Sequence, residues 1–192
     1  ELTADHDGVF VVNTENLNAI NSLGEIMIAA RHGGFAVHKG DKLAGMRVIP
    51  LVIKKEKMEE ARAAAGDRPL LDVIPFKKKK YGLVTAGNEV FYGRIEDTFS
   101  PVIQEKMDEF GASMAAHVIL NDDHEKITAA IDQMLDDGMD MVICTGGMSV
   151  DPDDRTPLAI KNTGADIVSY GAPVLPGAMF LLAYTNDGRP IM

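Results

Sequence analysis

One segment of the chain combines glycines, hydroxyls and carboxylates in an order that could bind a phosphorylated ligand. It reads Thr145-Gly146-Gly147-Met148-Ser149-Val150-Asp151-Pro152-Asp153-Asp154-Arg155-Thr156-Pro157. A Thr-Gly-Gly turn after an apolar strand exposes backbone N–H groups in a concave arrangement that suits an anion. Thr156 and Pro157 predict a helix start, as N-cap and first helical residue, which adds partial positive charge. The segment lacks the Gly-Lys-Ser/Thr ending of the Walker motif and the Gly-x-Gly-x-x-Gly spacing of dinucleotide sites.

Acidic side chains follow two earlier apolar runs. Gly87-Asn88-Glu89 and Asp97-Thr98 come after the first run, and Asn121-Asp122-Asp123 comes after the second. Each group has a structural alternative, because Asp97 or Thr98 could simply cap a helix and adjacent acids at a helix start are stabilised by the helix dipole. Gly87 permits a tight turn and a close approach of a ligand.

Glycine turns and helix starts attract anions, whereas the nearby carboxylates repel them. A divalent cation such as Mg²⁺ could bridge the acids and a phosphate, since it prefers oxygen ligands. Alternatively, the acids could accept hydrogen bonds from an N–H-rich heterocycle while the turn holds the phosphate. Both explanations indicate a ligand with a phosphate at one end and a donor-rich ring at the other.

The elements that must position these groups alternate between strand and helix after Tyr81. Apolar runs at Gly82–Thr85, Ala115–Leu120 and Met139–Cys144 are separated by helical patterns that begin near Ser100-Pro101 and at Asn121-Asp122-Asp123. This order predicts parallel β-α-β-α-β structure with right-handed crossovers. Ligands bind such sheets at the carboxyl ends of the strands, which is where the three polar segments begin.

Residues 1–76 predict a separate small α+β unit. The expected elements are a strand at Val9–Val12, a helix that follows a Ser22-Leu23-Gly24-Glu25 capping box and buries Leu23, Ile26, Met27 and Ala30, a β-rich stretch at Arg47–Ile53 and a helix at Lys55–Ala65. Lys77–Lys80 marks the boundary with a second domain at 77–192. Four lysines could bind an anion, but a solvated linker is the favoured interpretation.

Composition excludes several classes of protein. The chain has 192 residues, 46% of them hydrophobic, with a net charge of −10 and one cysteine. Such acidity disfavours binding to nucleic acid or an anionic membrane, and no apolar run is long enough to span a bilayer. A single cysteine excludes an internal disulfide, and we expect a cytoplasmic protein. Cys144 and His117 are expected to be structural, and His32 and His38 form too weak a pair for a metal site.

The motifs from Lys79 onward together resemble the molybdopterin-binding domain family. Gly87-Asn88-Glu89-Val90, Ile95-Glu96-Asp97-Thr98, Asp122-Asp123 and the segment from Thr145 to Pro157 carry the resemblance. The family includes molybdopterin adenylyltransferase and molybdopterin molybdotransferase, and the short front of this chain resembles stand-alone bacterial molybdopterin-binding proteins. The chain ends just after the opening of another strand, at Arg189–Met192, so we expect a domain truncated at its C-terminus.

The resemblance implies a three-layer α/β sandwich with a mostly parallel central sheet in a homo-oligomer, as dimer or trimer. It implies molybdopterin, a pterin phosphate, as ligand, with ATP and Mg²⁺ as further cofactors of a transferase. Asp122 and Asp154 would be catalytic, and Asp154 and Glu89 would bind the metal. The implied ligand-binding residues are Gly87, Asn88, Glu89, Asp97, Thr98, Thr145, Gly146, Gly147, Ser149, Thr156 and Pro157, and Pro173–Gly177 resembles a later loop of the pocket.

Three functions stay open at this point. The domain could support adenylyl transfer or molybdate insertion, or it could bind molybdopterin or the finished cofactor without turnover. The third alternative is a nucleotide pyrophosphatase of the competence-damage type, because that domain shares a similar Gly-Gly and Asp-Asp loop.

Overall fold

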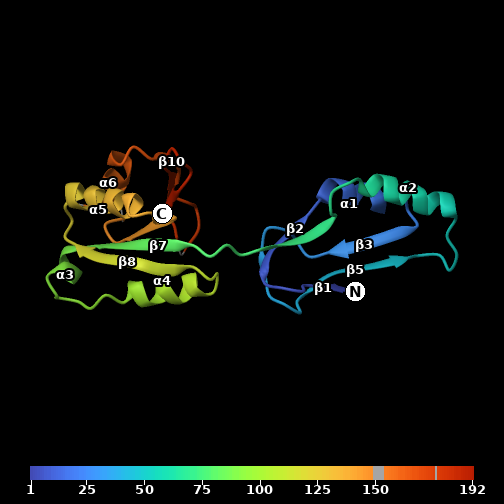
Figure 1. The fold of residues 1–192 in the computed structure, drawn as a ribbon, viewed down its shortest axis with the longest axis horizontal. Helices are drawn as coiled ribbons and strands as arrows, with labels where there is room; N and C mark the ends of the chain where they lie inside the picture. Colours follow the sequence, from blue (N-terminus) through green and yellow to red (C-terminus); the bar gives the residue numbers. More distant parts are fainter. Residues whose placement is uncertain (149–153, 176) are drawn as a thin grey trace. The chain divides into compact units, whose positions relative to one another are not determined.

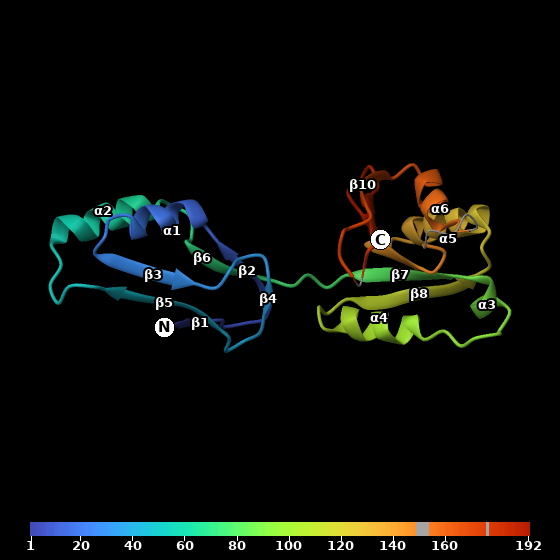
Figure 2. The same ribbon diagram turned by 180° about the vertical axis from the view of Figure 1, so that it is seen from behind.

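The computed structural model describes residues 1–148, 154–175 and 177–192. Within them the chain forms two compact units, Glu1–Phe76 and Lys77–Met192, which are drawn in Figures 1 and 2. No helix in the described part of the chain is long and apolar enough to cross a bilayer.

The first unit contains two three-stranded antiparallel sheets and two helices. One sheet has the order β1 (Leu2–Thr3), β5 (Lys42–Val48), β3 (Ile26–Ala30), and the other has the order β4 (Ala36–Val37), β2 (Gly8–Val12), β6 (Leu71–Pro75). The helices are α1 (Thr14–Asn21) and α2 (Lys55–Ala65). Leu17 and Ile20 of α1 pack with Ala61 of α2 over the β3 strand.

The predicted helix after Ser22 is wrong, because Ile26–Ala30 is strand β3. Ile26 and Ile28 are buried while Met27 is exposed, which is the period-two pattern of a strand. Ser22 lies at the end of α1 and donates its hydroxyl to the Asn18 carbonyl, so it does not begin a helix. The Asn21 amide also exchanges two hydrogen bonds with the backbone of Ile28, which holds the strand against the end of α1.

Two other predicted elements of this unit have different outcomes. The predicted helix at Lys55–Ala65 is confirmed as α2, which ends at Gly66. The β-rich stretch predicted at Arg47–Ile53 begins too late, since β5 covers Lys42–Val48.

The second unit is built on a six-stranded sheet, and the predicted mostly parallel sheet is confirmed. The strand order is β10 (Asp166–Tyr170), β11 (Leu181–Tyr184), β12 (Pro190–Ile191), β9 (Met141–Thr145), β7 (Lys80–Ala86), β8 (Ser113–Leu120). The four strands from β12 to β8 are parallel, and β10 and β11 add an antiparallel edge. In this order β7 lies between β8 and β9. After β7 the chain therefore forms β8 on one side of it and then crosses over to form β9 on its other side.

Helices cover both faces of this sheet, which gives three layers (Figures 1 and 2). On one face α4 (Phe99–Asp108) packs on Tyr81 and Leu83 of β7. On the other face α5 (His124–Asp136) and α6 (Thr156–Asn162) enclose the larger core with Val84. Alternate residues of β7 therefore serve the two cores, as expected for a strand buried on both faces.

The lysine run is partly anchored to the second unit. Lys79 Nζ lies 2.7 Å from Asp140 Oδ1, and the Lys80 N–H donates to Oδ2 of the same carboxylate over 2.8 Å. These hydrogen bonds, that from the Lys79 side chain first, lower the pKa of Asp140. The second half of the run therefore fixes the start of β7, whereas Lys77 and Lys78 precede that strand.

Candidate functional site

The three loops after β7, β8 and β9 meet at one edge of the sheet. Asp122, after β8, accepts the N–H of Asn88 at Oδ2 over 3.1 Å, and Asn88 opens the short helix α3 (Asn88–Phe91) after β7. A Cβ added to Gly147, after β9, would lie 3.6 Å from Oδ1 of the same Asp122. The Asp122 carboxylate therefore lies between the other two loops, hydrogen-bonded to the loop after β7 and close to the loop after β9.

The Gly146-Gly147 turn is held in place by two hydrogen bonds from Thr156. The Thr156 hydroxyl donates to the Gly146 carbonyl over 2.9 Å, and the Thr156 N–H donates to the Gly147 carbonyl over 3.2 Å. Both glycines have positive φ, 81° and 57°. A Cβ on Gly146 would lie 1.8 Å from the Ala86 carbonyl oxygen, so only glycine fits there.

Thr156 has a role different from the one the sequence indicated. It is the first residue of α6, and Arg155 occupies the N-cap position, so Thr156 does not cap the helix with its side chain. Its fully buried hydroxyl instead supports the glycine turn. Pro157 follows in the first helical turn, as expected from its missing N–H.

The adjacent acids Asp122 and Asp123 have separate tasks. Asp123 is the N-cap of α5 and accepts the N–H groups of Glu125 and Lys126, so the structural alternative is correct for this residue. The Lys126 N–H is the largest cause of the lowered pKa of Asp123. Asp122 is the acid that reaches the neighbouring loops.

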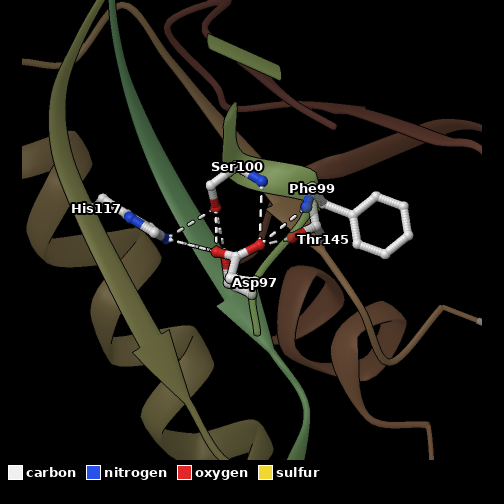
Figure 3. A network of polar contacts seen from close by, with 6 residues as sticks. Asp97, Phe99, Ser100, His117 and Thr145 are labelled. Carbon is white, nitrogen blue, oxygen red and sulfur yellow. Dashed lines mark hydrogen bonds and ion pairs between the residues drawn. The ribbon is translucent and has the colours of Figure 1, made fainter. Parts of the chain in front are cut away.

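Asp97 is the centre of a polar network on the α4 side of the sheet (Figure 3). Its Oδ1 accepts the N–H groups of Phe99 and Ser100 over 3.0 and 3.1 Å, which caps α4. Its Oδ2 accepts the Ser100 hydroxyl and lies 3.6 Å from Nε2 of His117 on β8. The capping alternative is therefore correct for Asp97, but its carboxylate also contacts the sheet.

The network continues through Thr85 to the glycine turn. Thr85 Oγ1 lies 3.0 Å from His117 Nε2 and 3.2 Å from Ser100 Oγ. Thr145, the last residue of β9, donates its hydroxyl to Thr85 Oγ1 over 3.4 Å. A chain of hydroxyls therefore links the imidazole to the residue just before Gly146.

Burial and hydrogen bonding act in opposite directions on Asp97. Desolvation is the largest single influence and raises the pKa of this carboxyl, but hydrogen bonds from Ser100 and Phe99 and the nearby His117 together lower it below its usual value. The carboxylate form is thus favoured in the folded chain.

A cavity of about 690 Å³ opens beside the glycine turn. Its polar part is Thr145, Gly146 and Gly147, and most of its other lining is apolar: Phe99, Cys144, Met148, Leu175, Gly177, Ala178, Met179, Phe180, Leu181 and Met192. The volume is in the range of small-molecule sites. Leu175 and Gly177 both belong to the Pro173–Gly177 loop, which the sequence predicts to be part of the pocket.

The structure brings some of the predicted site residues together at the glycine turn and leaves others apart from it. Thr145, Gly146 and Gly147 line the cavity, and Asn88, Asp122 and Thr156 surround the glycine turn. Gly87 donates its N–H to the Leu120 carbonyl and thereby connects the loops after β7 and β8. Glu89 and Thr98 are exposed, and Thr98 makes no capping bond with its side chain. Ser149 lies outside the described residues.

Asp154 has an unusual carboxylate. Its Oδ2 is buried and has no hydrogen-bond partner among the residues that the structure describes. Within the same residues, no group of three or more His, Cys, Asp or Glu side chains could hold a metal ion. A site at Glu89 and Asp154 therefore stays a prediction and would need further ligands from a bound molecule.

Sequence reasoning missed Thr85, Phe99, Ser100 and the bonded role of His117. Thr85 and His117 are polar residues in otherwise apolar strands, and this is the signal that could have found them. Phe99 could have been noticed as an aromatic residue directly after the Asp97-Thr98 pair.

The fold and these loops define an α/β domain of a known family. Residues 82–185 match the family described as "Probable molybdopterin binding domain", which is more than half of the chain. The chain belongs to this family.

Two curated relatives extend the comparison. A molybdopterin molybdenumtransferase of Synechococcus elongatus is 25% identical over 95% of this chain and 45% of its own length. The alignment therefore includes most of the Glu1–Phe76 unit. From the sequence alone, this unit resembles the front of stand-alone molybdopterin-binding proteins instead. A CinA-like protein of Mycobacterium avium is 33% identical over 75 residues, or 39% of this chain and 17% of the relative. The chain thus spans less than half the length of either relative.

A solved structure shows a similar fold. The protein CinA of Thermoplasma acidophilum has a TM-score of 0.53 and 18% identity, and the match covers 59% of this chain and 86% of the other. At this identity the likeness concerns the fold alone.

Proposed function

We propose that the Lys77–Met192 unit binds molybdopterin and supports adenylyl transfer or molybdate insertion in molybdenum-cofactor biosynthesis. The observation that carries this proposal is the meeting of three strand-end loops beside a cavity of about 690 Å³ that contains the Gly146-Gly147 turn. The family membership and the molybdenumtransferase relative support the same ligand.

The glycine turn is the proposed phosphate site. Because Thr156 binds the carbonyls of Gly146 and Gly147, the following N–H groups, those of Gly147 and Met148, point away from Thr156 across their trans peptides. Gly147 and Met148 both line the cavity. Their N–H groups are therefore available to a phosphate without any basic side chain.

The two carboxylates have different proposed roles. Asp122 is held by the Asn88 N–H and positions the loops around the phosphate. The buried Oδ2 of Asp154, which has no hydrogen-bond partner among the described residues, is suited to accept an N–H of the pterin ring or to bind Mg²⁺. Mg²⁺ is commonly held by one or two carboxylates together with substrate phosphates, so Asp154, with Glu89, would bind it only when phosphate is present. ATP and a dimer or trimer are further parts of this proposal.

Binding and turnover can be separated by one variant. Calorimetry of the chain with molybdopterin is expected to show binding. Incubation with molybdopterin, ATP and Mg²⁺ is expected to release pyrophosphate as the AMP group is transferred to the phosphate of molybdopterin. Asp154→Asn should abolish pyrophosphate release but keep much of the binding, whereas the exposed Asp166→Asn should change neither. Equal loss of binding and turnover in Asp154→Asn would contradict a catalytic role. Binding without pyrophosphate release or molybdate insertion would identify a carrier module.

A nucleotide pyrophosphatase is the second candidate, because CinA proteins are among the relatives in both sequence and fold. This candidate predicts hydrolysis of ADP-ribose and weak binding of molybdopterin. The same calorimetric titration with both compounds decides between the two functions.

A further inference from the structure

Phe99 is a large apolar side chain in an exposed position. It is 66% exposed, although it is the first residue of α4 and lines the cavity beside the glycine turn. An exposed aromatic ring at the rim of a cavity leaves apolar area in water that a ligand could cover. A ligand ring that covered Phe99 would therefore remove this apolar area from water, which favours binding.

The backbone of Phe99 is held firmly in place. Asp97 Oδ1 accepts its N–H over 3.0 Å, and the same carboxylate binds Ser100, which is buried. Figure 3 shows the Phe99 ring directed away from the Asp97 carboxylate, so the network holds the backbone of Phe99 while the residue stays largely exposed. Because the backbone is already fixed, only the side-chain rotamer of Phe99 has to be ordered when a ligand binds.

The rest of the cavity separates an apolar part from a polar part. Met148, Met179 and Phe180 contribute apolar surface, whereas the polar groups are gathered at Thr145 and the two glycines. A ligand that fits both parts has an apolar planar face and an anionic group. Free phosphate would use only the glycine turn.

We propose that Phe99 is a specificity-determining residue that stacks on the planar heteroaromatic ring of the ligand while the phosphate occupies the Gly146-Gly147 turn. The inference rests on the proposed function and deepens it, because it assigns the recognition of the ring to one side chain. Phe99 selects ring-bearing phosphates over inorganic phosphate and takes no part in bond breaking.

The chain contains no tryptophan, which allows a direct test. Phe99→Trp places a single indole at the proposed stacking position, and titration with molybdopterin or AMP is expected to quench its fluorescence. In calorimetry, Phe99→Ala and Phe99→Leu should weaken binding of these compounds roughly tenfold, while Phe99→Trp should keep it. The dissociation constant of inorganic phosphate itself, obtained from competition, should be unchanged. Phe35, which is 61% exposed in the first unit, provides matched controls as Phe35→Ala and Phe35→Trp.

The outcomes distinguish this inference from the proposed function. Normal molybdopterin affinity in Phe99→Ala overturns the stacking role and leaves the proposed function intact. Binding of AMP but not molybdopterin, with loss in Phe99→Ala, supports the stacking role and overturns the proposed function. Binding of neither compound by the unmodified chain overturns both. A change in oligomeric state in Phe99→Ala without a change in affinity assigns Phe99 to a subunit contact and also overturns the inference.

Discussion

The hydroxyl of Thr156 donates a hydrogen bond to the Gly146 carbonyl oxygen over 2.9 Å. This bond joins the start of α6 to the turn after β9, ten residues earlier in the chain, and the donor is fully buried. The shape of the proposed phosphate site therefore depends on a side chain beneath it.

Replacement of Thr156 by valine should destabilise the second unit. Valine keeps the shape but removes the donor, and a buried carbonyl without a partner costs about 1–3 kcal/mol. Thr156→Ser keeps the hydroxyl and should lose about 1 kcal/mol through the missing methyl group. Urea unfolding followed by circular dichroism measures both. Equal losses in the two variants would show that the hydrogen bond contributes little.

Gly146→Ala should be more harmful than Gly138→Ala. Both glycines have φ near +80°, so alanine is strained by about 1–2 kcal/mol at either position. A Cβ at Gly138 meets nothing within 4 Å, whereas at Gly146 it would lie 1.8 Å from the Ala86 carbonyl oxygen. The loss of unfolding free energy in Gly138→Ala measures the backbone strain, and the additional loss in Gly146→Ala measures the steric clash with the Ala86 carbonyl. Molybdopterin affinity should fall only in Gly146→Ala, because only that turn lies in the proposed site.

The elements of the second unit could be predicted because their signals are local. Apolar runs, helical spacing and the glycine that follows α5 lie within a few residues of the elements they define. The sequence of strand Ile26–Ala30 predicts a helix equally well, because all five of its residues are apolar and therefore fit either period. The Asn21 side chain that holds this strand exerts its effect through a contact, which spacing does not reveal.

The candidate site was predicted in part for the same reason. The glycine turn and Asp122 follow their strands directly, so the parallel-sheet rule places them at one edge. The network of Asp97, Ser100, Thr85 and His117 joins residues up to 32 positions apart. Its members are common polar residues, and only the pairing of β7 with β8 brings His117 close to Thr85.

The single cysteine should be unreactive in the folded chain. Burial raises the pKa of the Cys144 thiol to about 12, so the thiolate that reacts with alkylating reagents is scarce at pH 8. Iodoacetamide at pH 8 should modify the native chain far more slowly than the chain in urea, as measured by mass spectrometry. Comparable rates would show that the end of β9 opens readily.

Asp97 and Asp132 should affect stability in opposite directions as pH changes. The folded pKa of Asp97 is lowered, so its carboxylate stabilises the fold above the unfolded pKa near 3.8, and this contribution is lost as pH falls through the lower folded value. Asp97→Asn should therefore be less stable than the unmodified chain at pH 7, and the difference should shrink below about pH 4.

The pKa of Asp132 is raised by desolvation and by the negative charge of Asp136, one turn further along α5. Ionisation of Asp132 therefore disfavours the fold at neutral pH, so Asp132→Asn should be slightly more stable than the unmodified chain at pH 7. This gain should vanish once Asp132 is protonated in both states. Urea unfolding of the two variants between pH 3 and pH 7 measures both trends. Parallel pH curves for Asp97→Asn and the unmodified chain would show that the hydrogen bonds from Ser100 and Phe99 do not favour the carboxylate.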